Sequence, residues 1–140
     1  MATGVVMAGS SALGDDRAGV STLLLRYGAE LNGSRTSAIV GLYTSDGVFM
    51  PSGAPTAVGT DELRVAYDKV FAAIKLAVKF EIDEIAVQGD IAFARTVSRG
   101  NVTILANGVT QPEENRELFI LRRVSGAWYI ARYMFNQPRR

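Results

Sequence analysis

The hydrophobic pattern of this chain changes its period near Val78, and that change limits the folds open to it. Before Val78, apolar residues recur at helical spacing over residues 20–31 and again over residues 63–74. After it, apolar and polar residues alternate, first over residues 78–83, as they do in half-buried strands. Helices followed by strands predict an α+β fold.

Three helices are expected ahead of the sheet. The first begins near Asp15 or Asp16, whose carboxylates suit the exposed amides of a helix N-terminus. Ser34 can cap a short second helix, and Asp46-Gly47 then turns the chain into a strand over residues 48–50. Thr60 can cap the third helix, which has the clearest amphipathic pattern in the chain.

The remaining segments predict a long antiparallel sheet. The apolar positions change parity after residues 78–82, which places a bulge near Asp83-Glu84. Further strands are expected over residues 91–105, 115–124 and 127–136, joined by turns short enough for hairpins. The predicted fold is a cone-shaped roll in which three N-terminal helices pack on a curved, bulged, mostly antiparallel sheet.

The N-terminal segment differs in composition from the rest of the chain. Residues 1–14 are rich in Ala, Gly and Ser, and they lack the basic start and long apolar core of a secretory leader. We therefore expect a flexible tail over residues 1–14, then a single domain over residues 15–140. On the same ground we expect a cytoplasmic protein.

Charge and apolar run length argue against two classes of partner. Fifteen basic residues face 14 acidic ones, so the chain has no net field that attracts nucleic acid or an anionic membrane surface. No apolar run approaches the roughly 20 residues that span a bilayer. We expect neither a nucleic-acid partner nor a membrane.

The chain contains neither Cys nor His. This excludes disulfides, thiolate nucleophiles, imidazole bases and the common zinc ligand sets. Acid or base chemistry would have to use carboxylates, tyrosines, lysines or a bound cofactor. We expect no metal and no cofactor.

The strand over residues 91–105 carries small residues on one face: Ala92, Ala94, Thr96, Ser98 and Gly100. Such a row either lets helices pack closely or leaves room for a ligand. The two strands that follow are apolar on both faces, which favours a homodimer formed through the sheet. Glu117 and Arg132 are the charged residues expected inside; they either serve a site or pair with each other.

The stretch from Arg26 through Asn32-Gly33 to Pro51 resembles the start of the nuclear transport factor 2-like fold, which includes ketosteroid isomerases and SnoaL-like polyketide cyclases. The resemblance places the isomerase oxyanion-hole tyrosine at Tyr27. It places the two isomerase aspartates at about Pro51 and near Phe119, which cannot exchange protons. Ketosteroid isomerase activity is therefore not expected. The cyclases usually use Asp and His, and this chain has no His.

The resemblance implies an apolar cone suited to a flat or extended hydrophobic molecule such as a polyene or polyketide. Its expected catalytic residues are Glu117, assisted by Tyr27 or Arg132. The other residues expected in the pocket are Phe49, Met50, Tyr67, Phe71, Ser98, Asn115, Phe119, Tyr133, Met134 and Asn136.

The segments 95–100, 112–119 and 128–136 resemble a small actinobacterial subfamily associated with enediyne polyketide gene clusters. That resemblance implies a protein that binds a polyketide intermediate and assists its folding, cyclisation or release. The alternative is a non-catalytic partner of the polyketide synthase or its thioesterase; a steroid-type isomerase is least favoured. Whether a reaction is catalysed stays open, but an activity would be cyclase- or isomerase-like, without metal or histidine.

Overall fold

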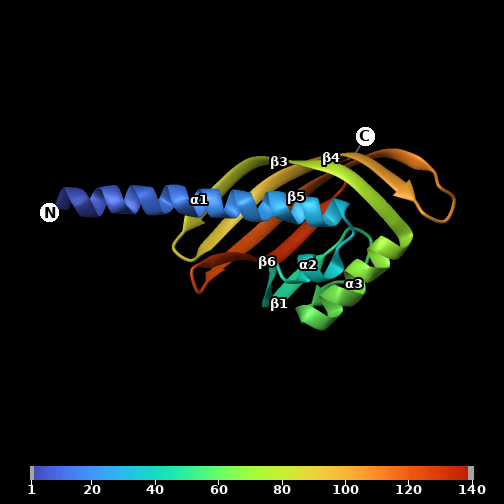
Figure 1. The fold of residues 1–140 in the computed structure, drawn as a ribbon, viewed down its shortest axis with the longest axis horizontal. Helices are drawn as coiled ribbons and strands as arrows, with labels where there is room; N and C mark the ends of the chain where they lie inside the picture. The colour runs from blue at the N-terminus through green and yellow to red at the C-terminus, as the bar shows by residue number, and fades with distance from the viewer. Residues whose placement is uncertain (1, 139–140) are drawn as a thin grey trace.

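The computed structural model describes residues 2–138, and side chains within residues 14–138. The described residues form three helices and six strands (Figure 1). In chain order these are α1 (Ala2–Asn32), α2 (Thr36–Val40), β1 (Tyr43–Met50), β2 (Ala57–Val58), α3 (Gly59–Ala73), β3 (Ile74–Gln88), β4 (Ile91–Ile104), β5 (Thr110–Val124) and β6 (Ala127–Asn136).

The six strands form one sheet in the order β2-β1-β6-β5-β4-β3. Only the β1–β6 pair is parallel; the other pairs are antiparallel. At the β5–β6 turn, Ser125 has φ 52° and Gly126 has φ 82°. Positive φ at both central residues is the geometry of the two-residue turns that match the twist of a hairpin. The α+β class and the mostly antiparallel sheet are confirmed.

Helix α1 lies across the concave face of the sheet, and α2 and α3 lie to one side of its C-terminal part, below it in Figure 1. The apolar stripe expected on α1 is buried: Val20, Leu23, Leu24, Tyr27 and Leu31. A Cβ at Gly28 would lie 2.8 Å from the Phe80 ring, so glycine lets the helix sit close to β3. Asn32 then joins helix to strand, since its side-chain amide donates to Val78 O (2.7 Å) and accepts from Val78 N (3.0 Å).

The helix starts differ from those expected. Helix α1 begins at Ala2, ahead of the expected start near Asp15. Neither Ser34 nor Thr60 is a cap: the N-cap positions of α2 and α3 are Arg35 and Val58, and neither makes a side-chain cap hydrogen bond. The side chains of residues 2–13 lie outside the described part, and the expected division of the chain at residue 14 stays a prediction.

The sheet contains a bulge where the sequence predicts one. The β3–β4 register shifts between Ile82 and Glu84, so Asp83 is the extra residue. Arg95, opposite this point, bonds to both Glu84 (3.0 Å) and Asp83 (3.3 Å). The bulge increases local twist and contributes to the curvature of the sheet around α1.

A further bulge in β6 was not predicted. Ile120 pairs with Arg132 and Leu121 pairs with Ile130, so Ala131 is the extra residue on β6. Beyond it the inward and outward faces exchange, because side chains alternate along a strand. Tyr133 is therefore buried, while Met134 is exposed.

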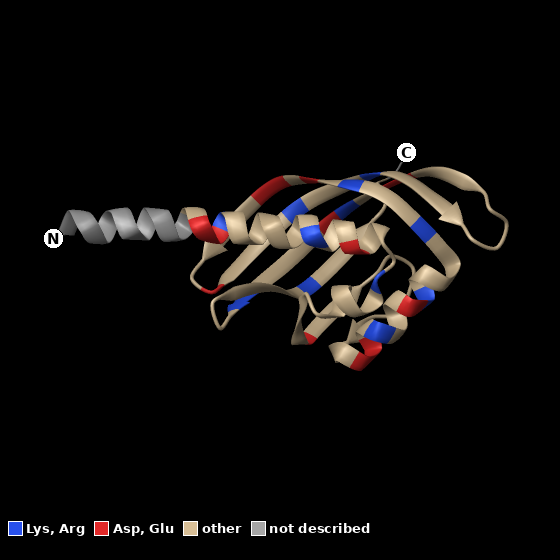
Figure 2. Cartoon of the chain, in the orientation of Figure 1, with Lys and Arg blue, Asp and Glu red and all other residues tan. Residues whose placement is uncertain are grey.

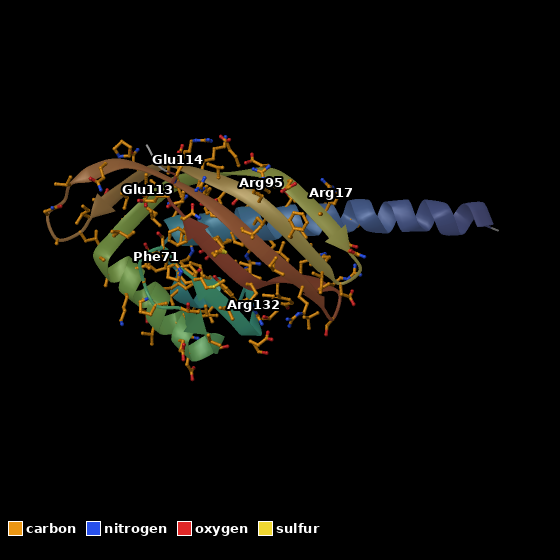
Figure 3. The ribbon with its side chains drawn as sticks, turned by 180° about the vertical axis from the view of Figure 1, so that it is seen from behind. Arg17, Phe71, Arg95, Glu113, Glu114 and Arg132 are labelled. Carbon is orange, nitrogen blue, oxygen red and sulfur yellow. The ribbon has the colours of Figure 1, made fainter. Side chains whose placement is uncertain are left out.

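The convex face of the sheet, seen in Figure 3 with α1 behind it, carries apolar and charged residues together. Phe93, Leu118 and Met134 are each about 40% exposed there. Arg99 bonds to Glu114 (2.7 Å) and Glu81 (3.1 Å) on this face. In Figure 2 acidic and basic residues are also interspersed along α1 and α3. Within residues 2–138, no helix combines the length and apolar composition that crossing a bilayer requires.

Candidate functional site

A cavity of about 610 Å³ lies between the concave face of the sheet, the C-terminal end of α1 and α3. Much of its apolar lining comes from four parts of the chain: α1 supplies Leu31, the segment after β1 supplies Pro51 and Pro55, α3 supplies Val65, Ala66 and Val70, and β3 supplies Ile74, Leu76, Val78 and Phe80. This volume is ample for a small organic ligand. The alternating apolar residues of β3 therefore form one wall.

Aromatic rings form the opposite wall. Phe49 of β1 stacks on Tyr67 of α3, with centroids 4.7 Å apart, and on Tyr133 of β6, 5.4 Å apart. All three line the cavity. The three rings are held nearly parallel, since the interplanar angles are 7° and 6°. Such a wall suits the face of a flat unsaturated molecule.

Three tyrosine hydroxyls form a buried row beside this wall. The Tyr67 hydroxyl lies 2.7 Å from that of Tyr27 and 2.6 Å from that of Tyr43. Burial raises the pKa of all three phenols above the ordinary value, so they stay neutral. Three hydroxyls carry three protons and the row uses two of them, so one proton is left to donate elsewhere. It lies at an end of the row when Tyr67 donates to one neighbour and accepts from the other.

Glu117 is buried on the inward face of β5, where its side chain is only 4% exposed. Thr96 donates to one carboxyl oxygen and Ser98 to the other, each at 2.6 Å. Both hydroxyls come from the neighbouring strand β4, whose Thr96 pairs directly with Glu117. Burial raises the pKa of the Glu117 carboxyl, and the two hydrogen bonds oppose that rise.

Asn115 precedes Glu117 by two residues and lies on the same face of β5. Its side chain lines the cavity, and the residue is 8% exposed. The Oδ1 atom is buried and has no hydrogen-bond partner among the described residues. A polar atom left in this state is uncommon in a folded protein.

The cavity brings together seven of the residues that the sequence assigns to the site. These are Tyr27, Phe49, Tyr67, Ser98, Asn115, Glu117 and Tyr133. Their roles in binding or catalysis stay predictions. The expected alternative pairing of Glu117 with Arg132 is absent from the described ion pairs, because Glu117 faces Thr96 and Ser98 instead.

Arg132, Met134 and Asn136 do not line the cavity, because the bulge at Ala131 turns them outward. Arg132 donates to Asp46 O at 3.0 Å, and Figure 3 shows it well apart from Glu113, which does line the cavity. Asn136 is exposed and accepts from Arg116.

Met50, Phe71 and Phe119 also lie outside the lining. Met50 follows Phe49 on β1 and therefore points to the opposite face. Phe119 is fully buried behind Tyr133, with ring centroids 4.2 Å apart. Phe71 packs on the core beside Tyr67, and the cavity side of α3 is formed by Ala66 and Val70.

Sequence reasoning missed most of the apolar lining. The pattern of residues 78–82 indicated the inward face of β3, and the stripe of α3 included Ala66 and Val70, so those signals were present. Pro55 belongs to no periodic pattern and gave no signal. Pro51 was indicated only by the resemblance, which places an isomerase aspartate at about this position. Phe135 lines the cavity because it lies beyond the unpredicted bulge.

The comparisons with known proteins agree on one family. The model of the SnoaL-like domain matches residues 24–131. A ketosteroid isomerase-like protein from Erwinia carotovora atroseptica is 35% identical, with a TM-score of 0.84, over 88% of this chain and 96% of that one. No curated protein matched the chain.

Two more distant structures share the fold alone. An NTF2-like protein with a cystatin-like fold from Novosphingobium aromaticivorans is 23% identical, with a TM-score of 0.77, over 92% of this chain and 86% of that one. A conserved protein from Planctomyces limnophilus is 22% identical, with a TM-score of 0.76, over 87% of this chain and 97% of that one. The match over residues 24–131 and the 35% identical structure place this chain in the SnoaL-like domain family, with the nuclear transport factor 2-like fold.

Proposed function

We propose that this protein binds a flat or extended apolar molecule of the polyketide type in its cavity and assists its folding, cyclisation or release. The observation that carries the proposal is the 610 Å³ cavity, which has parallel aromatic rings on one wall and a buried carboxyl on the sheet. The resemblance of segments 95–100, 112–119 and 128–136 supports an enediyne pathway as the setting.

The chemistry that this cavity can supply is orientation, exclusion of water and one proton transfer. Glu117 is the group that we propose for proton transfer; in support, Thr96 and Ser98 orient both of its oxygens and burial raises its pKa. Tyr27 can donate to a ligand oxygen when it carries the spare proton of the hydroxyl row. Arg132 has no part in this proposal, because it lies outside the cavity.

A ketosteroid-type isomerase remains the least favoured reading. Pro51 and Phe119 occupy the positions where the resemblance places the isomerase aspartates, and neither side chain can exchange a proton. Fast turnover of a simple enone would contradict this ranking.

The test is product analysis with the cognate enediyne synthase and thioesterase. Mass spectrometry would compare products formed without the protein, with it, with Glu117→Gln and with Ala66→Phe, which puts a bulky ring into the cavity. A product that needs both Glu117 and an open cavity supports catalysis. A product lost only with Ala66→Phe supports binding without proton transfer, and an unchanged profile in every reaction contradicts the proposal.

A second candidate is a non-catalytic partner of the synthase or thioesterase, and the convex face of the sheet favours it. Phe93, Leu118 and Met134 expose apolar surface there beside arginines such as Arg95. The same face is also where we propose that a homodimer forms. Replacing Leu118 with Glu should halve the mass in light scattering if two copies meet there; an unchanged dimer contradicts that arrangement. Loss of synthase binding with a retained oligomeric state would favour the synthase instead.

A further inference from the structure

The wall of the cavity formed by β5 carries one hydrogen-bond acceptor that no described residue satisfies. Asn115 Oδ1 is buried, lines the cavity and has no partner among residues 14–138. A carbonyl oxygen only accepts, so its missing partner must be a donor. Because burying an unpaired polar atom is costly, its retention at a cavity wall points to a partner that arrives with the ligand.

Glu117 adds acceptor capacity next to this atom. Asn115 and Glu117 are two residues apart on one strand face, so their Cα atoms are separated by roughly 7 Å. Each carboxyl oxygen of Glu117 accepts one hydroxyl at 2.6 Å and has a second lone pair. The ion pairs within residues 14–138 include none to Glu117, so no cation of the described chain compensates it.

The other charged residues that line the cavity also disfavour a ligand carboxylate. Three further carboxylates, Asp61, Glu62 and Glu113, line the cavity, and Lys69 is the single basic residue in the lining that the described chain supplies. A ligand carboxylate placed against Asn115 Oδ1 would meet an unpaired carbonyl oxygen there and the Glu117 carboxyl beside it. Facing acceptors oppose such binding, and like charges oppose it further whenever Glu117 is ionised.

We propose that Asn115 and Glu117 form a subsite that selects a hydrogen-bond-donating group on an otherwise apolar ligand, either a hydroxyl or an amine, and that it rejects carboxylates. This inference rests on the proposed function, because it specifies which end of the ligand meets β5. The apolar body lies between β3 and the aromatic wall of Phe49, Tyr67 and Tyr133.

The test uses four naphthalene probes that differ only in one substituent: 2-methylnaphthalene, 2-naphthalenemethanol, 2-naphthylmethylamine and 2-naphthoate. Their dissociation constants are measured from the change in naphthalene fluorescence on titration with the protein. We expect the alcohol or the amine to bind about tenfold more tightly than 2-methylnaphthalene, and 2-naphthoate to bind most weakly. Tighter amine binding identifies Glu117 as an ionised partner, and tighter alcohol binding identifies a neutral hydroxyl as the preferred group.

Variants separate the subsite from the cavity. Asn115→Leu, of similar size, should remove most of the donor advantage while 2-methylnaphthalene binds as before. Asn115→Asp keeps acceptor oxygens at the same position and should retain the advantage, which keeps the test valid if the leucine variant fails to fold. Asn101→Leu, on an exposed part of β4, is the matched control and should change nothing.

The outcomes are distinguishable. If 2-methylnaphthalene binds and the alcohol and amine show no advantage, or if Asn115→Leu retains the advantage, the subsite is wrong and the proposed cavity function stands. If 2-naphthoate binds most tightly, the subsite is also wrong. If none of the four probes binds, the proposed cavity function itself fails.

Discussion

The two halves of β4 face the same concave side of the sheet but have different roles: one packs in the core and the other lines the cavity. At one end Ala92 and Ala94 are buried in the core below α1, with Leu121 and Ile130 from the neighbouring strands. At the other end Ser98 lines the cavity and donates to Glu117. One row of small residues therefore serves both purposes that its sequence allows, close packing and room for a ligand. The difference comes from what lies opposite, helix α1 or open space.

The largest effect should come from the core that packs against the Ala92 and Ala94 end of β4. Replacing Leu121, which is fully buried, with Ala should lower the free energy of unfolding by about 3 kcal/mol, because a cavity forms where the core cannot collapse. Leu76→Ala at the cavity wall should cost less, since one side of Leu76 already faces a void. Urea denaturation of both variants measures the difference. Equal losses of unfolding free energy would mean that the core around Leu121 and the cavity wall at Leu76 are packed alike.

Enlarging a small residue should lower stability at the packed end of β4 but not at the cavity. Ala94→Leu should destabilise the protein by about 1–3 kcal/mol, because the packed half has no room for extra methyl groups. Ala66→Leu, which points into the cavity, should leave stability nearly unchanged and weaken binding of 2-methylnaphthalene. Thermal unfolding and probe titration check the pair. A stable Ala94→Leu variant would contradict the close packing assigned to β4.

A smaller effect should appear in the pH dependence of stability. Burial raises the folded-state pKa of Glu117 above its unfolded value, so the folded state holds this proton more tightly. The stabilisation from this tighter proton binding is complete at pH values below the pKa of Glu117 in the unfolded chain. It is lost as the pH rises through the pKa of Glu117 in the folded protein. Relative to Glu117→Gln, the wild-type protein should therefore lose stability as pH rises from about 4.5, the ordinary value for Glu. A difference that does not vary with pH would show that this carboxyl is not perturbed.

The smallest effect is expected outside both halves. Arg132 is half-exposed and lies 4.0 Å from the Asp46 carboxylate, a surface pair worth under about 1 kcal/mol. Arg132→Ala should change stability by no more than that and should leave binding of all four naphthalene probes as it is in the wild type. Weakened probe binding would return Arg132 to the site and contradict the outward orientation that follows the bulge.

The contrast between two bulges explains which parts of the fold could be predicted. The bulge at Asp83 shifted the apolar positions from Ile82 to Ile85, and that change of parity was visible in the sequence. The bulge at Ala131 lies in a strand that has apolar residues at both its odd and its even positions. The extra residue therefore does not visibly change the alternation of apolar and polar residues. The strands themselves were recognisable because alternation and turn residues are local signals.

The same contrast separates the site residues that were found from those that were not. Asn115 and Glu117 lie on a strand with uninterrupted alternation, and the cavity contains both. The bulge at Ala131 could not be recognised from the sequence. The residues just past it were therefore assigned to the wrong face: Arg132, Met134 and Asn136. Pro51 and Pro55 line the cavity from a segment without a periodic pattern, so no alternation or helical spacing indicates which way they face.

The row of three tyrosine hydroxyls has a direction. If Tyr67 accepts from one neighbour and donates to the other, all protons along the row point the same way, toward Tyr27 or toward Tyr43. A ligand acceptor at Tyr27 selects the first orientation, and a ligand donor there selects the second. Tyr43 does not line the cavity, yet its hydroxyl must rotate whenever the polarity of the bound group changes. The row thus carries the polarity of a ligand atom to a residue that the ligand does not contact.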